Sequence, residues 1–297
     1  MKAVKRWIKQ RPALMAVYRR VSWPVHVLLD QFSSLVWNPT REVTTPLGFK
    51  LTSGRHPAYT QMRLGTFEEP ETAVIVRELQ QSDVFVDVGA NLGYYTLLAL
   101  KHGKRAVAFE PQAQNLKCLF KNLEANGWSQ EAEVFPVALA DKPGVLTLFG
   151  ASGPSASLVE GWAGYSSRFK QTVPVSTLDR ILDHQYPNNR LLVKIDVEGA
   201  EFGVLGGALA TLTREPRPAW LIEVCLNEYH PGGNPNFLAL FELFWSHGYQ
   251  ASIADGPKVE RADVERWLKN GRTDTGAFNY LFTAPKPAAR EQAGSQD

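Results

Sequence analysis

The sequence predicts an α/β protein whose sheet is mostly parallel and covered by helices on both faces. Short apolar runs alternate along the chain with segments of helical periodicity, and a glycine-rich turn directly follows the first run. Continuous apolar runs are typical of strands that are buried on both faces of a parallel sheet. These runs lie at residues 84–88, 106–109, 134–137, 191–197 and 220–225.

Helices are expected between these strands, because apolar residues recur there with a helical period. They are predicted at residues 68–81, 94–100, 112–126, 177–184, 200–212 and 237–247. Two further apolar runs, 249–253 and 278–283, flank a short helix near residues 264–269. We expect these last two strands to pair antiparallel at the edge of the sheet.

The 297 residues can hold one full α/β core and an appendage. Residues 73–284 are predicted to form the catalytic domain that carries the sheet. Residues 1–72 are predicted to form an N-terminal appendage of basic amphipathic helices followed by a hairpin over residues 41–51. Residues 285–297, rich in Ala, Pro, Gln and Ser, are predicted to be a disordered tail.

Positive charge is concentrated at the N-terminus, where seven basic residues precede the first acidic residue, Asp30, in a chain of net charge +2. The remainder is therefore mildly acidic, which argues against a nucleic-acid partner. Apolar residues at helical spacing within residues 1–38 indicate helices that pack on the catalytic domain, form a homodimer, or contact an anionic membrane surface.

The composition favours a cytoplasmic location, with attachment to the inner face of the membrane as an option for residues 1–38. No apolar run approaches the ~20 residues of a transmembrane helix. The basic N-terminus is interrupted by Trp23 and Pro24 and does not form a signal-peptide core. Cys118 and Cys225 are predicted to be buried free thiols, which suits a reducing compartment.

The glycine-rich turn runs Asp87-Val-Gly-Ala-Asn-Leu-Gly-Tyr-Tyr-Thr96 and joins a strand to a helix. Glycine at positions 89 and 93 permits a tight turn and close approach of a ligand to the backbone. Asn91 and Tyr95 stand where a dinucleotide-binding turn has glycine, so pyrophosphate fits poorly. A cofactor without phosphates fits better, and Asp87 can receive the cationic amino group of a methionine moiety.

A second acidic residue, Glu110, ends the strand that follows, about 20 residues further on. A carboxylate at this place can accept two hydrogen bonds from the two hydroxyls of a ribose. Together with the turn, Glu110 predicts a nucleoside-containing cofactor.

Four motifs in this order resemble the FkbM family of methyltransferases. They are the turn over residues 87–96, Phe109-Glu-Pro111, Val137-Ala-Leu-Ala-Asp141 and Lys194-Ile-Asp-Val-Glu-Gly-Ala-Glu201. The resemblance covers residues 65–249 and implies a Rossmann-like class I methyltransferase sheet that uses S-adenosylmethionine (SAM). It also implies that Ala138 lies beside the adenine, with Asp141 as a candidate for its exocyclic amine.

The candidate catalytic residues follow the fourth and fifth strands. Alternation along residues 191–197 places Lys194 and Asp196 on one face of the strand, with Asp196 at the rim where open α/β sheets bind ligands. A buried Lys194 needs a carboxylate partner, and Glu223 on the neighbouring strand is the expected one. His230 has a suitable pKa range to remove a hydroxyl proton near neutral pH.

A divalent cation is an alternative role for part of this set. Asp196, Glu223 and His230, with Glu198 and Glu228 nearby, offer oxygen and nitrogen ligands, although no tight spacing requires a metal. Glu201 is expected to stabilise a helix N-terminus instead of acting in catalysis. A loop of small residues at 150–157, followed by Trp162 and Tyr165, is either a mobile loop with aromatics for stacking on sugar rings or an ordinary connection.

The sequence therefore predicts a SAM-dependent O-methyltransferase acting on a hydroxyl of a sugar, glycan or natural product. The amide-methylating motif Asp/Asn-Pro-Pro-Tyr is missing after the fourth strand, which favours oxygen as the acceptor atom. Two alternatives stay open: a nicotinamide-dependent oxidoreductase, and a non-catalytic membrane-associated protein on a degenerate methyltransferase fold.

Overall fold

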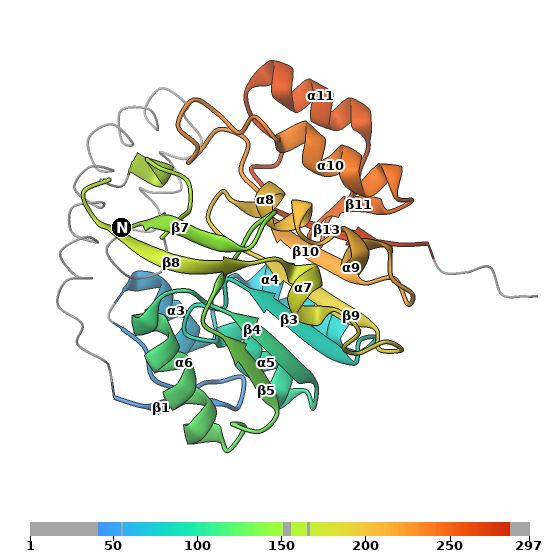
Figure 1. Cartoon of the computed structure of the whole chain (residues 1–297). Helices are drawn as coiled ribbons and strands as arrows, with labels where there is room; N and C mark the ends of the chain where they lie inside the picture. The colour runs from blue at the N-terminus through green and yellow to red at the C-terminus, as the bar shows by residue number, and fades with distance from the viewer. Residues whose placement is uncertain (1–40, 55, 151–155, 165–166, 286–297) are drawn as a thin grey trace, which may run out of the picture.

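The computed structural model describes residues 41–54, 56–150, 156–164 and 167–285. Its centre is an eight-stranded sheet with the order β12-β11-β13-β10-β9-β3-β4-β5 (Figure 1). The strands are β3 (Val84–Val88), β4 (Arg105–Phe109), β5 (Ala132–Phe135), β9 (Leu191–Ile195), β10 (Ala219–Glu223), β11 (Gln250–Ile253), β12 (Lys258–Val259) and β13 (Asn279–Thr283).

The sheet is parallel from β5 to β10, and β13 pairs antiparallel with both β10 and β11. This is the expected class I methyltransferase arrangement, mostly parallel with an antiparallel strand near one edge. The predicted antiparallel pairing of the last two long strands is confirmed. The edge itself is taken by β12, a two-residue strand that the sequence pattern did not indicate.

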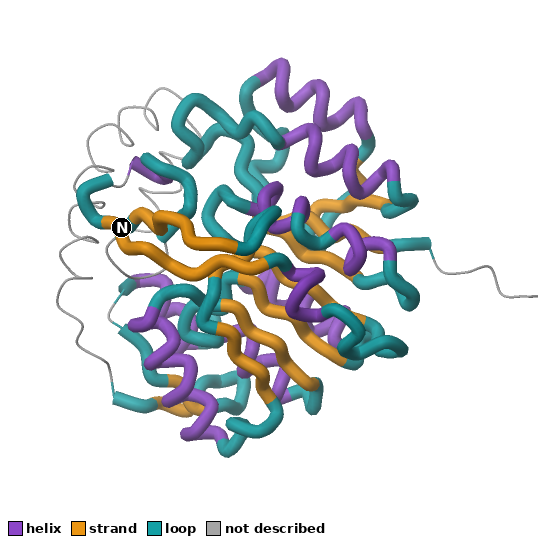
Figure 2. The backbone as a smooth tube through the Cα atoms, viewed as in Figure 1, coloured by secondary structure: helices purple, strands orange, loops and turns teal. Residues whose placement is uncertain are grey.

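Helices cover both faces of the sheet (Figure 2). One face carries α3 (Pro57–Leu64), α4 (Glu69–Leu79), α5 (Tyr94–Lys101) and α6 (Ala113–Asn126). The other carries α7 (Leu178–Leu182), α8 (Glu201–Gly206), α9 (Leu209–Thr213), α10 (Phe237–Ser246) and α11 (Arg261–Asn270).

Alternation along each strand divides the core between these layers. In β3, Val84, Val86 and Val88 pack in the cluster on the α10 side, whereas Phe85 packs in the cluster on the α5 side. All five residues of β3 are buried, as the continuous apolar run predicts. Both cysteines are buried free thiols, as expected.

The predicted hairpin is present as β1 (Val43–Thr44) and β2 (Lys50–Leu51), which pair antiparallel. Asn122 of α6 fastens the chain just after this hairpin: its side-chain oxygen accepts from Thr52 N at 2.7 Å, and its amide donates to the oxygens of Thr52 and Leu92, both at 3.0 Å. The boundary at residues 72 and 73 stays a prediction, but residues 41–72 share the core of the α5 face through Phe49 and Leu51. Residues 1–38 lie outside the described residues.

A second, three-stranded sheet follows β5 and was not predicted. It contains β6 (Ala138–Leu139), β7 (Gly144–Phe149) and β8 (Lys170–Ser176), and β7 and β8 form an antiparallel pair. The segment between β7 and β8 therefore connects two paired strands. Of this connection, residues 151–155 and Tyr165 lie outside the described residues. Single-sided strands were harder to recognise because four of the six β7 residues are exposed.

The single helix expected at residues 200–212 was wrong. The chain forms two short helices, α8 and α9, separated at Gly207 and Ala208. A Cβ on Gly207 would lie 2.2 Å from the carbonyl oxygen of Ala140, so the backbone of this break touches the second sheet. The carboxylate of Asp179 accepts from Ala210 N at 2.8 Å and from Thr211 N at 2.7 Å, which satisfies N–H groups at the start of α9.

The turn after β3 and the turn after β9 are in direct backbone contact. Gly89 has φ of 90°, and a Cβ at this position would lie 1.9 Å from the carbonyl oxygen of Asp196. The amide of Asp196 also donates to the carbonyl oxygen of Val88 at 3.0 Å. A side chain at position 89 would push apart the two turns that form the rim of the sheet.

Gly89→Ala is expected to lower the free energy of unfolding by more than Gly103→Ala does. Gly103 also has a positive φ, of 71°, but open space where its Cβ would lie. The control should cost only the roughly 1–2 kcal/mol of a left-handed non-glycine residue, while Gly89→Ala adds a backbone clash. Urea unfolding of both variants measures the difference, and equal losses would contradict the contact.

Candidate functional site

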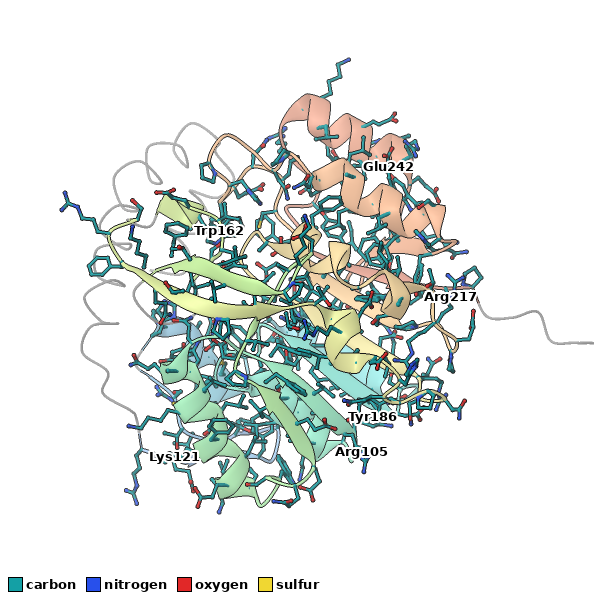
Figure 3. The ribbon with its side chains drawn as sticks, in the orientation of Figure 1. Arg105, Lys121, Trp162, Tyr186, Arg217 and Glu242 are labelled. Atoms are coloured by element: carbon teal, nitrogen blue, oxygen red, sulfur yellow. The ribbon has the colours of Figure 1, made fainter. Side chains whose placement is uncertain are left out.

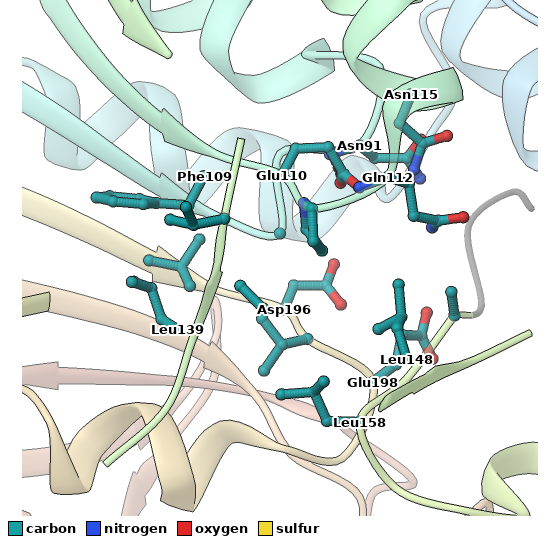
Figure 4. A pocket seen from close by; sticks show the side chains of 17 residues that line it. Asn91, Phe109, Glu110, Gln112, Asn115, Leu139, Leu148, Leu158, Asp196 and Glu198 are labelled. Atoms are coloured by element: carbon teal, nitrogen blue, oxygen red, sulfur yellow. Dashed lines mark hydrogen bonds between the residues drawn. The ribbon is translucent and has the colours of Figure 1, made fainter. Parts of the chain in front are cut away.

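Two cavities open at the carboxyl ends of β3, β4 and β9, the rim where open α/β sheets bind ligands. The first cavity, drawn in Figure 4, lies between the turn after β4 and the second sheet. Its lining includes Glu110, Gln112, Asn115, Ala138, Leu139, Leu148 and Leu158. The second cavity lies under α3 and the start of α4, and its lining includes Met62, Phe67, Glu68, Asp87, Tyr94, Tyr95, Lys194 and Glu223.

The two cavities share a wall. Gly89 and Asn91 from the turn after β3, and Asp196 and Glu198 from the turn after β9, line both. An elongated ligand made of two parts would therefore extend across this wall, with one part in each cavity.

Glu110 lies in the first cavity, where the ribose-binding prediction requires a carboxylate. Its Oε2 accepts from Asn91 N and its Oε1 from Gln112 N, both at 2.8 Å. These bonds fix the carboxyl in place and leave lone pairs for a diol. Burial raises the pKa of Glu110 to about 7, although the backbone donors oppose that shift. Ala138, predicted beside the adenine, also lines this cavity.

Asp141 does not line either cavity. Its side chain is 60% exposed, and its carboxylate lies 3.9 Å from Lys142 Nζ. The predicted contact with an adenine amine thus has no support from its position.

The second cavity is acidic, with Lys194 as the basic residue among its lining carboxyl groups. Lys194 Nζ donates to Asp196 Oδ2 at 2.7 Å, and the lysine is 2% exposed. Burial opposes its charge, but Asp196, Glu68 and Asp87 outweigh that effect and raise the pKa of Lys194. The lysine therefore stays protonated.

The predicted pairing of Lys194 with Glu223 was wrong. In the parallel register of β9 and β10, Lys194 is opposite Leu221 and Ile195 is opposite Ile222. Glu223 is therefore level with Asp196, one step beyond the lysine. Burial, with Asp196, Glu198 and Glu68 nearby, raises the pKa of Glu223 well above its usual range.

Asp87 and Thr96 link the turn after β3 to the strand before it. Thr96 Oγ1 donates to Asp87 Oδ2 at 2.6 Å, and Asp87 is opposite Lys194 in the pairing of β3 with β9. Burial raises the pKa of Asp87, while Lys194 opposes the shift. Gly93 is required nearby, because a Cβ there would lie 2.3 Å from Leu119 Cδ1.

Sequence reasoning missed Glu68, which lies just before α4. Tyr95 Oη donates to Glu68 Oε2 at 2.7 Å, and Lys194 Nζ lies 4.9 Å from the centre of the Tyr95 ring. Burial raises the pKa of Glu68 to about 7, against the opposing charge of Lys194. Its place at the start of a predicted helix suggested only a structural role, so no local pattern identified it.

Trp162 joins the second sheet to the turn after β9; Figure 3 labels it on the connection between β7 and β8. Trp162 Nε1 donates to Glu198 Oε2 at 2.6 Å. The indole is 3% exposed and packs edge-on to His230, 4.8 Å between ring centres, so it is not free to stack on a sugar as expected.

His230 does not line either cavity but lies behind the shared wall. Its Nε2 is buried without a hydrogen-bond partner among the described residues, and burial lowers the pKa of His230. Glu201 has the structural role expected of it: its Oε1 accepts from Gly199 N at 2.8 Å at the start of α8.

Within the described ranges, no group of three or more His, Cys, Asp or Glu side chains is arranged to hold a metal ion. The candidates Asp196, Glu223 and His230 therefore gain no support as ligands. Across the same part of the chain, no helix combines the length and apolar character needed to cross a membrane.

The sequence profile described as Methyltransferase FkbM domain matches residues 87–251, more than half of the chain. The chain belongs to the FkbM family of methyltransferases. The match begins at Asp87 in the turn after β3 and ends in β11, so it includes both turns of the shared wall. Membership of this SAM-using family argues against the nicotinamide-dependent alternative.

Solved structures with this type of fold are only distantly similar in sequence. Methyltransferase FkbM from Methylobacillus flagellatus is 18% identical, with a TM-score of 0.43, 68% of this chain covered and 44% of that one. This FkbM-family chain thus spans less than half the length of that protein. An O-methyltransferase from Bacillus cereus in complex with SAH is 12% identical, with a TM-score of 0.42 and coverage of 93% and 98%. A putative tRNA (m1A22) methyltransferase from Streptococcus pneumoniae, in complex with S-adenosyl-L-methionine, is 14% identical, with a TM-score of 0.39 and coverage of 74% and 75%. No curated protein sequence matches significantly.

Lys194→Met is expected to lower the free energy of unfolding by about 2–4 kcal/mol at pH 8 and by less at pH 5.5. Breaking a buried pair leaves its partner uncompensated, and the 24% exposure of the Asp196 side chain reduces that cost. Without the lysine, the folded-state pKa values of Glu68 and Asp87 rise further above their unfolded values. The loss therefore grows as the pH rises and these groups must ionise.

Urea unfolding at the two pH values measures this effect. The double variant Lys194→Met with Asp196→Asn is the control, and it should be more stable than Lys194→Met alone at pH 8. A loss that is equal at both pH values would show that the lysine acts through packing and not through charge.

Proposed function

We propose that this FkbM-family protein transfers the methyl group of SAM to a hydroxyl of a sugar, glycan or natural product. The observation that carries the proposal is the shared wall between the two cavities. SAM consists of an adenosine part and a methionine part joined at a sulfonium cation, and the cavities offer one space for each part.

The chemistry of each cavity supports this assignment. The first combines apolar side chains for an adenine with Glu110 for the ribose hydroxyls. The second has Glu68, Asp87, Asp196, Glu198 and Glu223 against Lys194, and this excess of carboxyl groups suits a ligand with ammonium and sulfonium charges. When bound, SAM supplies an activated methyl group.

Asp196 and His230 are proposed to serve the hydroxyl acceptor. Asp196 lines both cavities, and Lys194 keeps its carboxylate charged and oriented. His230 stays largely neutral near pH 7, because burial lowers its pKa, and a neutral imidazole can accept a proton. Alignment of acceptor and methyl group should contribute more than the base, since positioning can supply effective molarities of about 10⁵–10⁸ M.

Contact of residues 1–38 with an anionic membrane, or their use in a homodimer, stays a proposal based on the sequence alone. A membrane-bound glycolipid acceptor would give the first option a purpose. The seven basic side chains before Asp30 are its support.

Glu110→Ala is expected to weaken SAM binding at least about tenfold, or ~1.4 kcal/mol. The substitution removes the carboxylate that would accept the ribose hydroxyls. Titration calorimetry measures the affinity, and a thermal melt must accompany it because two backbone N–H groups lose their acceptor. Glu131→Ala, on the exposed surface before β5, is the control. Unchanged affinity in folded Glu110→Ala would remove this residue from the ribose site.

Transfer of a tritiated methyl group from SAM to a panel of hydroxylated glycans and metabolites is expected to label an oxygen. Asp196→Ala and His230→Ala should each lower turnover about 10²–10⁴-fold, the usual contribution of acid–base catalysis, while SAM still binds. If both variants keep near-normal rates, the acceptor site lies elsewhere. Label recovered on nitrogen or carbon would contradict the proposed acceptor atom.

A further inference from the structure

Glu198 has an exceptional place on the wall shared by the two cavities. The wall consists of Gly89, Asn91, Asp196 and Glu198, so two of its residues bring a carboxyl group. The carboxylate of Asp196 is paired with Lys194 Nζ at 2.7 Å. The carboxyl of Glu198 has no ion pair with a basic residue in the described part of the chain.

The carboxyl of Glu198 is held firmly on one side and is open on the other. Its Oε2 accepts from Trp162 Nε1 at 2.6 Å, and its backbone oxygen accepts from Ser157 Oγ at 2.5 Å. Its Oε1 has no hydrogen-bond partner among the described residues. The residue also has a left-handed φ of 56°, a conformation that a Glu rarely adopts.

Negative charge surrounds this carboxyl. Asp196 and Glu201 come from its own segment, Glu223 from the end of β10, and Lys194 from β9 contributes the opposing positive charge. His230, from the loop after β10, faces the neighbouring Gly199 with its Nε2. Burial, followed by the charge of Asp196, raises the pKa of Glu198 well above its usual range. The group therefore holds its proton near neutral pH until a positive charge is bound beside it.

We propose that Glu198 distinguishes SAM from its product S-adenosylhomocysteine (SAH) by charge: the carboxyl stays protonated beside the neutral thioether and releases its proton to solvent when the sulfonium is bound. This inference rests on the proposed use of the two cavities by SAM. SAM and SAH carry the same adenosine, ammonium and carboxylate groups and differ in one methyl group and one positive charge. Interactions with the shared groups therefore cancel when the two ligands are compared.

The test is the ratio of the SAH and SAM dissociation constants, measured by titration calorimetry between pH 6 and pH 8. A proton released only with SAM makes SAM binding tighter as the pH rises and leaves SAH binding unaffected. The ratio should rise with pH, by at most about tenfold per pH unit, the limit for one linked proton. Titration of SAM in two buffers with different ionisation enthalpies should report the same proton directly.

Two variants assign the proton to a residue. Glu198→Gln keeps an oxygen to accept from Trp162 Nε1 but cannot ionise, so its ratio should not change with pH. Glu201→Gln is the matched control: Glu201 is a buried carboxyl on the same segment, burial raises its pKa to about 7, and it lines neither cavity. This control should keep the pH-dependent ratio of the parent protein.

A ratio that is independent of pH in the parent protein overturns the inference even if Glu198→Gln does not fold. A pH-dependent ratio that persists in folded Glu198→Gln also overturns it, and its loss in Glu223→Gln would then assign the proton to Glu223. Failure of both SAM and SAH to bind would instead overturn the proposed function. Tighter SAM binding at pH 8 that Glu198→Gln abolishes supports the assignment.

Discussion

The buried ion pair between Lys194 and Asp196 is the interaction on which the rest of the site depends. A lysine in the middle of a central strand is costly to bury, and it remains charged here because carboxyl groups surround it. Its positive charge allows Asp196 to lie ionised at the rim, and it opposes the protonation of Glu68 and Asp87. The residue thus sets the charge of the second cavity without needing to contact a substrate.

Two turns that are distant in sequence form one rigid wall around this pair. The close contact of Gly89 with the backbone of Asp196 joins the turn after β3 to the turn after β9. Glu110 and Trp162 extend the wall through hydrogen bonds to Asn91 and to Glu198. Cofactor-side and acceptor-side residues are therefore positioned by the same backbone, which favours the precise alignment that methyl transfer requires.

The sheet and the cofactor turn were predictable from the sequence because their signals are local. β3 is apolar throughout and ends in a glycine-rich turn, and Glu110 ends the next strand. The partner of Lys194 was not predictable, since it depends on the register of two strands, and register decides which of Asp196 and Glu223 is level with the lysine. Glu68 and Trp162 were recognisable only from tertiary contacts, and β7 was hidden by its exposed face.

The clasp made by Asn122 has a practical consequence for engineering shorter versions of this protein. Its amide bonds tie the segment after β2 to α6 and to the turn after β3, and Asn122 is fully buried. Deleting everything before the matched family region would strip this amide of two of its three partners and uncover the α5 face where Phe49 and Leu51 now pack. A minimal catalytic fragment must therefore retain the hairpin.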